Sequence, residues 1–308
     1  MESSKESLEK LAQTLLFEKQ YISSSSLYNG WAGYAVTLFE ISRQLSNEKL
    51  EEEAFLLIQK ALIVQLDDYS FDTGYAGIGY ALMHLIQEDF LDADYQELFG
   101  DKLEQTLHYF LDLEFRPMEL LSNYKLPLFL SSLSDIQNPR LNELSDKVFS
   151  GLELYLSLQF HDWRDVAYIG NHRFVLHVFR WYLLMILKEP QRIPSFYLLD
   201  SYCSLYLNNL VESSISVGVC LSQIGECHNK SLYKEVAQLH LHFSKSSRNF
   251  DYFQLPDAIL DARLLREFSH QENDIYRQIQ LELTAIPVWK GNNLLLYSNY
   301  ITHSNFIF

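Results

Sequence analysis

Apolar residues recur at helical spacing along most of the chain, and alternating strand-like stretches are nearly absent. Over residues 47–65 the apolar positions are Leu50, Ala54, Leu57 and Ala61, which fall at i, i+4, i+7 and i+11. This spacing places the four side chains on one face of an α-helix. Over residues 101–110 the same pattern is repeated by Leu103, Leu107 and Phe110. The pattern predicts an all-α fold.

Two segments in the first third of the chain share a glycine-led pattern. SLYNGWAGYAVTLFE and SFDTGYAGIGYALMH align with an offset of 44 residues, which pairs Gly30 with Gly74. Because glycine lacks a Cβ, it permits a tight turn into a helix and the close approach of a neighbouring backbone. We therefore expect each segment to form a helix that packs closely against its neighbours. The small residues behind this expectation are Ala32 and Gly33 in one segment and Ala76, Gly77 and Gly79 in the other.

Weaker copies of this unit continue the series. At intervals of 48 residues they place Ser122, Gly170 and Gly218 at the glycine position. The next unit, at residues 253–265, lacks the glycine. The last unit has a glycine again, at Gly291. The six intervals from Gly30 to Gly291 average 43.5 residues, which suits two helices and two connections. A more charged amphipathic segment lies between successive units. The pattern predicts one domain over residues 1–308, built from seven pairs of inner and outer helices and closed into a ring, because an open array exposes both ends.

Composition and charge narrow the class of protein. Apolar residues make up 48% of the chain, with 20 Phe and 20 Tyr, which is enough for a large core. The net charge of −16 argues against a general nucleic-acid binder and favours either simple solubility or a basic partner such as a cationic peptide. No apolar run is long enough for a membrane span, and MESSKESLEK lacks the apolar core of a signal peptide. Three cysteines without a CxxC suit a reducing compartment, so we expect a cytoplasmic protein.

The two glycine-led segments resemble the G-x-x-G inner-helix repeat of the lanthionine synthetase C-like (LanC-like) family. As a periodicity, the resemblance covers most of the chain. It implies an α/α toroid of seven inner and seven outer helices. The active members of that family are zinc cyclases, which join a Cys thiolate to a dehydrated Ser or Thr of a peptide and so form a thioether.

The zinc site implied by the resemblance does not carry over to this chain. The family's ligands are two Cys and one His, with a Cys-His pair just before a repeat glycine. The residues before Gly170, Gly218 and Gly291 are instead Tyr168 and Ile169, Ser216 and Val217, and Trp289 and Lys290. The family's acid-base His, also placed before a repeat glycine, has no match either. We therefore expect no zinc and no other cofactor.

One Cys-His pair does occur, at Cys227 and His228, ten residues after Gly218 rather than before it. Cys220 precedes Cys227 by two helical turns, about 10 Å along the axis. Zinc ligands must lie within about 2.3 Å of one metal ion. We therefore interpret these cysteines as structural.

Candidate site residues fall at the two ends of the predicted inner helices. Residues that could line a cavity at the glycine end are Tyr28, Asn29, Asp72, Thr73 and His172; Asp72 could act as a base or as an N-cap. Ten residues after the glycine position, five successive units carry a polar side chain: Glu40, His84, Ser132, Arg180 and His228. This polar tier is either a binding rim or the point where inner helices end and meet water, and we favour the latter. Arg173, His177 and Arg180 form a basic face that binds an anion or, as we favour, pairs with acidic neighbours.

These observations favour a LanC-like protein without zinc, which acts as a peptide-binding or accessory factor in lanthipeptide-type maturation. Its expected partners are a peptide substrate or a maturation enzyme. One alternative is an active toroid enzyme, either a thioether cyclase or a carbohydrate-active enzyme, which predicts a deep polar pocket with paired carboxylates or a buried histidine at the glycine end. Another alternative is an interaction scaffold, which predicts a broad exposed apolar patch. No catalytic residue is assigned.

Overall fold

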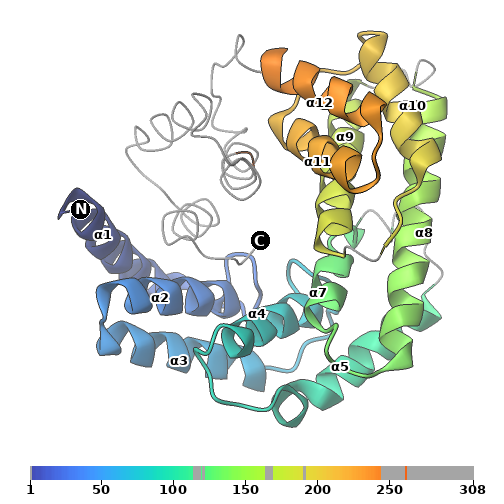
Figure 1. Cartoon of the computed structure of the whole chain (residues 1–308). Helices are drawn as coiled ribbons and strands as arrows, with labels where there is room; N and C mark the ends of the chain where they lie inside the picture. Colours follow the sequence, from blue (N-terminus) through green and yellow to red (C-terminus); the bar gives the residue numbers. More distant parts are fainter. Residues whose placement is uncertain are drawn as a thin grey trace. The chain divides into compact units, whose positions relative to one another are not determined.

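The computed structural model describes residues 2–113, 119, 122–163, 169–189, 192–243 and 261. Throughout these residues the regular secondary structure is helical, without a strand (Figure 1). The all-α class predicted from the apolar spacing is thus confirmed for this part of the chain. No helix in the same ranges is both long and apolar enough to cross a membrane.

The chain divides into two compact units, which are described separately. Unit 1 comprises Met1–Glu114, Leu128–Leu144 and Val288–Phe308, and unit 2 comprises Phe115–Pro127 and Ser145–Pro287. The single domain over residues 1–308 remains a prediction.

Unit 1 contains the first helices of the chain. They are α1 (Glu2–Glu18), the short 3-10 helix η1 (Lys19–Tyr21), α2 (Trp31–Leu45), α3 (Glu48–Ile63), α4 (Tyr75–Gln87), α5 (Tyr95–Asp112) and most of α7 (Leu126–Ser132). α2 turns back into α3 through only two residues, and the second of them caps α3. The side chain of that residue, Asn47, accepts hydrogen bonds from the backbone N–H groups of Lys49 and Leu50 at 3.1 and 3.4 Å. This cap satisfies N–H groups that the helix itself leaves unpaired.

The apolar faces predicted from the sequence are buried in unit 1. In α3 the buried side chains include Leu50, Ala54, Leu57 and Ala61, and in α5 they include Leu103, Leu107 and Phe110. Large aromatic side chains fill the space between the helices. Those of unit 1 that are almost fully buried are Phe39, Phe71, Tyr75, Phe99, Phe110 and Phe129.

Unit 2 contains most of α8 (Pro139–His161) together with α9 (Ile169–Lys188), α10 (Phe196–Leu207), α11 (Ile215–Cys227) and α12 (Ser231–Phe243). Serine side chains cap two of these helices: Ser195 precedes α10, and Ser214 precedes α11. The almost fully buried aromatic side chains of unit 2 are Phe149, Phe179, Tyr182, Tyr202 and Tyr233.

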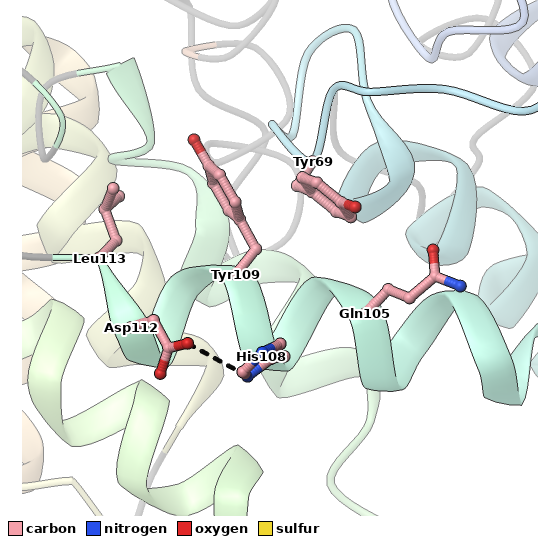
Figure 2. A pocket seen from close by; sticks show the side chains of 6 residues that line it. All are labelled: Tyr69, Gln105, His108, Tyr109, Asp112 and Leu113. Carbon is pink, nitrogen blue, oxygen red and sulfur yellow. Dashed lines mark ion pairs between the residues drawn. The ribbon is translucent and has the colours of Figure 1, made fainter.

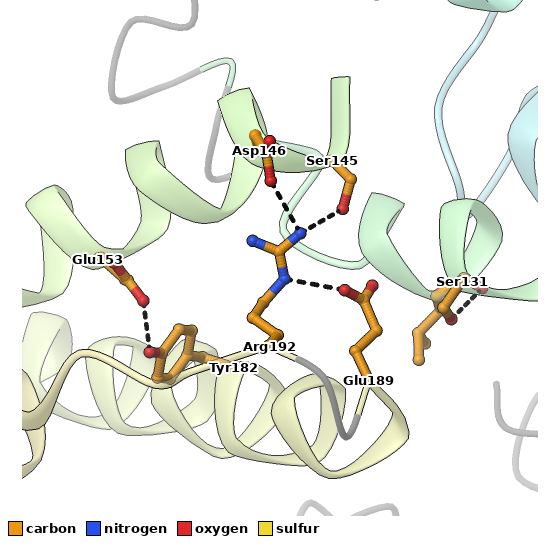
Figure 3. A network of polar contacts seen from close by, with 8 residues as sticks. Ser131, Ser145, Asp146, Glu153, Tyr182, Glu189 and Arg192 are labelled. Carbon is orange, nitrogen blue, oxygen red and sulfur yellow. Dashed lines mark hydrogen bonds and ion pairs between the residues drawn. The ribbon is translucent and has the colours of Figure 1, made fainter. Parts of the chain in front are cut away.

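A charged network ties the segment after α9 to α8 within unit 2 (Figure 3). The Arg192 guanidinium donates to Ser145 Oγ at 3.0 Å, to Asp146 Oδ1 at 3.1 Å and to Glu189 Oε2 at 2.8 Å. It also lies over the Phe149 ring, 4.0 Å from the centroid. Burial lowers the pKa of Arg192, but its bonds to Glu189 and Asp146 outweigh that effect and raise the pKa overall. The Arg192 guanidinium is therefore a cation held in place by three acceptors.

Among the units that the structure describes, the first two keep the glycine at its predicted place. Gly30 and Gly74 immediately precede α2 and α4 as N-caps. In contrast, Gly170 is the second residue of α9, Gly218 is the fourth residue of α11, and Ser122 precedes α7 by four residues. The helix starts have thus slipped relative to the glycine, and Ser214 is the true counterpart of Gly30 in the α11 unit. Gly291 and the unit at residues 253–265, apart from Asp261, lie outside the described residues.

Candidate functional site

The loops that lead into α2 and α4 fold back tightly onto their helices, and glycine makes this possible. A Cβ added to Gly74 would lie 2.4 Å from the backbone oxygen of Asp68, and one added to Gly30 would lie 2.2 Å from that of Ser26. Both distances are far below van der Waals contact, so a larger residue would displace the loop. The backbone N–H of Tyr75 donates to Asp68 O at 3.0 Å, which closes the second loop. The close backbone approach expected from the glycines is confirmed here.

The four predicted cavity residues of unit 1 lie in these two loops. Tyr28 and Asp72 are half-buried, whereas Asn29 and Thr73 are exposed. The loops contact each other, because the Tyr28 N–H donates to the backbone oxygen of Asp72 at 3.0 Å. Asp72 is not the N-cap of α4: that position is Gly74, which has no side chain to cap with.

A different aspartate organises the loop before α4. Asp68 accepts hydrogen bonds from the Ser70 backbone N–H at 2.8 Å and from the Thr73 hydroxyl. Burial raises the pKa of Asp68, but the hydrogen bonds from Thr73 and Ser70 outweigh it, and the net pKa lies below the usual value. Asp68 is therefore an anion that holds the loop in shape. The sequence offered a sign of this role in the D-x-S-x-x-T spacing, which is typical of side chains that bond to nearby backbone.

An open groove of about 420 Å³ lies beside this loop, between it and the C-terminal half of α5 (Figure 2). It is lined by Tyr69, Gln105, His108, Tyr109, Asp112 and Leu113. The Tyr69 and Tyr109 rings stack with centroids 4.6 Å apart at an interplanar angle of 21°. On the same stretch of α5, His108 Nδ1 lies 3.2 Å from Asp112 Oδ2. Since α4 begins directly after the loop, the groove lies at the glycine end of the α4 unit.

The polar tier has two members that form a buried pair in unit 1. Glu40 is 6% exposed and His84 is 8% exposed, and His84 Nε2 lies 3.1 Å from Glu40 Oε1. Our preferred interpretation, that these positions meet water at helix ends, is therefore wrong for this pair. Both helices continue beyond the pair, α2 to Leu45 and α4 to Gln87, so the equivalent positions face each other across the α2–α4 contact.

The remaining tier residues are half-buried. Ser132 ends α7, and its backbone oxygen accepts a hydrogen bond from Gln87 Nε2 at 3.0 Å. In unit 2, His228 follows α11 and packs against the Phe196 ring at 5.4 Å, edge to face. Arg180 lies within α9, and its positive charge acts to lower the pKa of both Tyr202 and His240.

The predicted basic face of α9 is split between different environments. Arg173 is exposed, whereas the half-buried His177 accepts a hydrogen bond from Trp181 Nε1 at 3.2 Å and lies 3.0 Å from the Tyr124 hydroxyl. Because the indole N–H can only donate, His177 Nε2 is the acceptor of that bond. These two contacts are with aromatic residues, and the pairing of this face with acidic neighbours stays a prediction. His172, the fifth cavity candidate, stacks on Trp163 with ring centroids 4.0 Å apart.

Sequence reasoning missed a buried histidine at the start of α11. His240, on α12, is 0% exposed and lies against Tyr206, with ring centroids 3.7 Å apart. His240 Nδ1 accepts the Ser214 backbone N–H at 3.0 Å, and its Nε2 lies 3.4 Å from the Tyr202 hydroxyl. Burial, with a smaller contribution from Arg180, lowers the pKa of His240 to about 3.

A buried histidine at the glycine end of a repeat is what the enzyme alternative predicted, but both ring nitrogens of His240 are used by the fold. Its two nitrogens bond to a helix-capping backbone group and a tyrosine, so neither faces a reacting molecule. The first turn of α11 is equally committed, because the Ser216 N–H donates to Asp261 Oδ1 at 2.9 Å.

The cysteines occupy separate environments in unit 2. Cys203 and Cys220 are buried, whereas Cys227 is exposed. Burial, together with the nearby Asp200, raises the pKa of Cys203 to about 12, which suppresses thiolate formation. Within the ranges that the structure describes, no three His, Cys, Asp or Glu side chains gather in a way that could hold a metal ion.

Comparison with known proteins adds no family assignment. No family model matches the chain, and no curated protein matches it either. The resemblance to LanC-like proteins thus remains a prediction.

Proposed function

We propose that this chain is a LanC-like protein without a zinc site, which binds a peptide during lanthipeptide-type maturation and does not itself form the thioether. The proposal includes the full α/α toroid of seven inner and seven outer helices. It is supported by the two units in which a glycine-capped inner helix is followed by a more charged outer helix: α2 with α3, and α4 with α5.

The observation that carries the proposal is the groove beside α5. It lies at the glycine end of a repeat unit, which is the end where the resemblance implies family chemistry. It offers stacked aromatic rings and the exposed Asp112 carboxylate, and Tyr109 is 44% exposed. Aromatic rings that keep a polar tip in solvent are enriched at protein-binding surfaces, because they give a large contact area at low entropic cost. Such a groove suits a bound peptide segment, and its lining residues include no cysteine or serine.

We also propose a cytoplasmic location. This is supported by the three cysteines, which form no disulfide in the structure. Structural disulfides are rare in compartments where thiols are kept reduced.

A peptide-display selection tests the binding proposal. Random twelve-residue peptides are selected on the immobilised full chain and, in parallel, on the Tyr109→Ala and Tyr197→Ala variants. We expect enrichment on the wild type and on Tyr197→Ala, since Tyr197 is an exposed tyrosine of unit 2. Enrichment should be lost on Tyr109→Ala. No enrichment on the wild type would overturn the proposal.

Metal analysis tests the absence of zinc. The purified chain should contain less than stoichiometric zinc after equilibration with the metal and desalting. Stoichiometric zinc that is lost in Cys227→Ala or His228→Ala would show that the one Cys-His pair is a metal site. A gene for a peptide precursor or a dehydratase beside the gene for this chain would further support the maturation role.

A further inference from the structure

We infer that the groove beside α5 binds an arginine side chain of the peptide, with its guanidinium stacked on Tyr109 and paired with Asp112. This inference rests on the proposed function, because it names the residue that the peptide places in the groove.

The first argument is the aromatic surface. The Tyr109 ring stacks on the Tyr69 ring. It also makes an edge-to-face contact with Phe110, with ring centroids 5.1 Å apart and an interplanar angle of 76°. The row of rings continues from Tyr69 to Tyr75, with centroids 5.7 Å apart. A cation of the protein already occupies the far end of this row, since Lys102 Nζ lies 5.8 Å from the Tyr75 ring centroid. Ring faces of tyrosine attract cations at this distance.

The second argument is the negative charge at the groove. Asp112 follows Tyr109 by three residues and therefore lies on the same face of α5. Its side chain is 69% exposed, so the contact with His108 leaves most of the carboxylate open to solvent. α5 ends at Asp112 and has no basic residue in its last turn. The backbone carbonyls of a helix C-terminus carry partial negative charge, which adds to that of Asp112.

The third argument is that the groove is shaped before a ligand arrives. The Asp68 anion fixes the loop that presents Tyr69, through its bonds to Ser70 and Thr73. The Tyr69–Tyr109 stack therefore needs little reorganisation on binding, which favours affinity. The net charge of −16 also attracts a cationic peptide over longer range.

Arginine fits this arrangement better than lysine. The guanidinium is planar, so it stacks on a ring while its N–H groups form paired hydrogen bonds with a carboxylate. An ammonium group is a compact point charge that can satisfy one of these contacts fully but not both.

Four fluorescein-labelled peptides of nine residues test the inference. They share glycine, serine and alanine flanks and differ only at the centre, which is arginine, lysine, citrulline or glutamate. Citrulline has nearly the shape of arginine but no charge. Fluorescence anisotropy with the full chain at low salt should rank arginine above lysine, with citrulline about five- to tenfold weaker than arginine and glutamate weakest.

Three protein variants test which residues cause the preference for arginine. Asp112→Asn should bring the affinities for arginine and citrulline to within about twofold of each other. Tyr109→Ala should weaken the arginine peptide about fivefold, while Tyr197→Ala should leave it unchanged. Salt should weaken arginine binding and leave citrulline binding nearly unaltered.

Equal affinity for arginine and citrulline would overturn the inference. So would an arginine preference that survives Asp112→Asn and Tyr109→Ala, or a failure of all four peptides to bind. Each of these outcomes leaves the proposed function standing if the display selection still enriches peptides that depend on Tyr109.

Discussion

Replacement of Gly77 by alanine tests how closely the loop before α4 packs onto the first turn of that helix. Inside an ordinary helix, alanine is about 1 kcal/mol more favourable than glycine, so propensity alone predicts a gain in stability. The surroundings of Gly77 reverse this sign. A Cβ at that position would lie 2.0 Å from the backbone oxygen of Phe71 and 2.9 Å from the Cβ of Leu27, whereas ordinary van der Waals contact begins at 3.4 Å.

The closest of these neighbours is a backbone atom, so the loop itself has to move. Forcing extra atoms into a packed site costs about 1–3 kcal/mol, and displacement of a backbone segment belongs at the upper end of that range. After subtracting the gain from propensity, we expect Gly77→Ala to lower the free energy of unfolding by about 2 kcal/mol.

Urea titration followed by far-UV circular dichroism measures this change, and Gly100→Ala is the matched control. Gly100 is also inside a helix, α5, but its added Cβ would meet only the flexible Gln96 side chain, at 3.1 Å. We expect the control to raise the free energy of unfolding by up to about 1 kcal/mol. If the two variants are stabilised equally, the loop does not pack against α4 as described.

Three further predictions concern polar side chains that are buried or half-buried. His240 has a pKa of about 3 in the fold against 6.5 when unfolded, so its contribution to stability is complete above pH 6.5 and is lost as the pH falls below that value. Urea titration should show unit 2 losing about 2 kcal/mol between pH 6.5 and 5, and His240→Gln should flatten this slope; equal slopes would refute the assignment. His84→Ala removes one hydrogen-bond partner of the buried Glu40 side chain and should cost about 1–3 kcal/mol by the same titration; a loss below about 0.5 kcal/mol would contradict the burial of the pair. Arg192→Ala should lower the free energy of unfolding of unit 2 by about 1–3 kcal/mol in a denaturant titration, and an unchanged midpoint would show that the network contributes nothing.

The parts of the fold that were predictable are those fixed by local spacing. The face that contains Leu57 and the caps at Gly30 and Gly74 were visible because helical periodicity and a repeated motif determine them without reference to distant residues. The later helix starts were not predictable from the glycine alone. In the α11 unit a serine cap at Ser214 sets the helix start, and Gly218 instead gives room for His240, whose Cβ lies 2.9 Å from a Cβ added there.

The candidate site needed tertiary information. The repeat in the sequence already placed Glu40 and His84 at equivalent positions. Their burial as a pair depends on the packing of α2 against α4, which the sequence does not reveal. The groove depends on a loop tyrosine, Tyr69, that meets Tyr109 forty residues later. One sign was present in the sequence, because Tyr109 is an aromatic residue on the polar side of the amphipathic α5. A single exposed ring is common on proteins, and so this sign has little weight without the structure.

The hydrogen bond from the Tyr28 N–H to the backbone oxygen of Asp72 has a consequence for how the chain can vary. It joins the leading loops of two consecutive repeats through main-chain atoms, so substitution of either side chain leaves the bond intact. In a repeat array, stability is divided between each repeat and its interface with the next, and this bond belongs to the interface. Deletion of the α2–α3 pair would therefore remove a partner from α4 as well as its own contacts. The first two repeats are expected to be gained, lost or unfolded as one block.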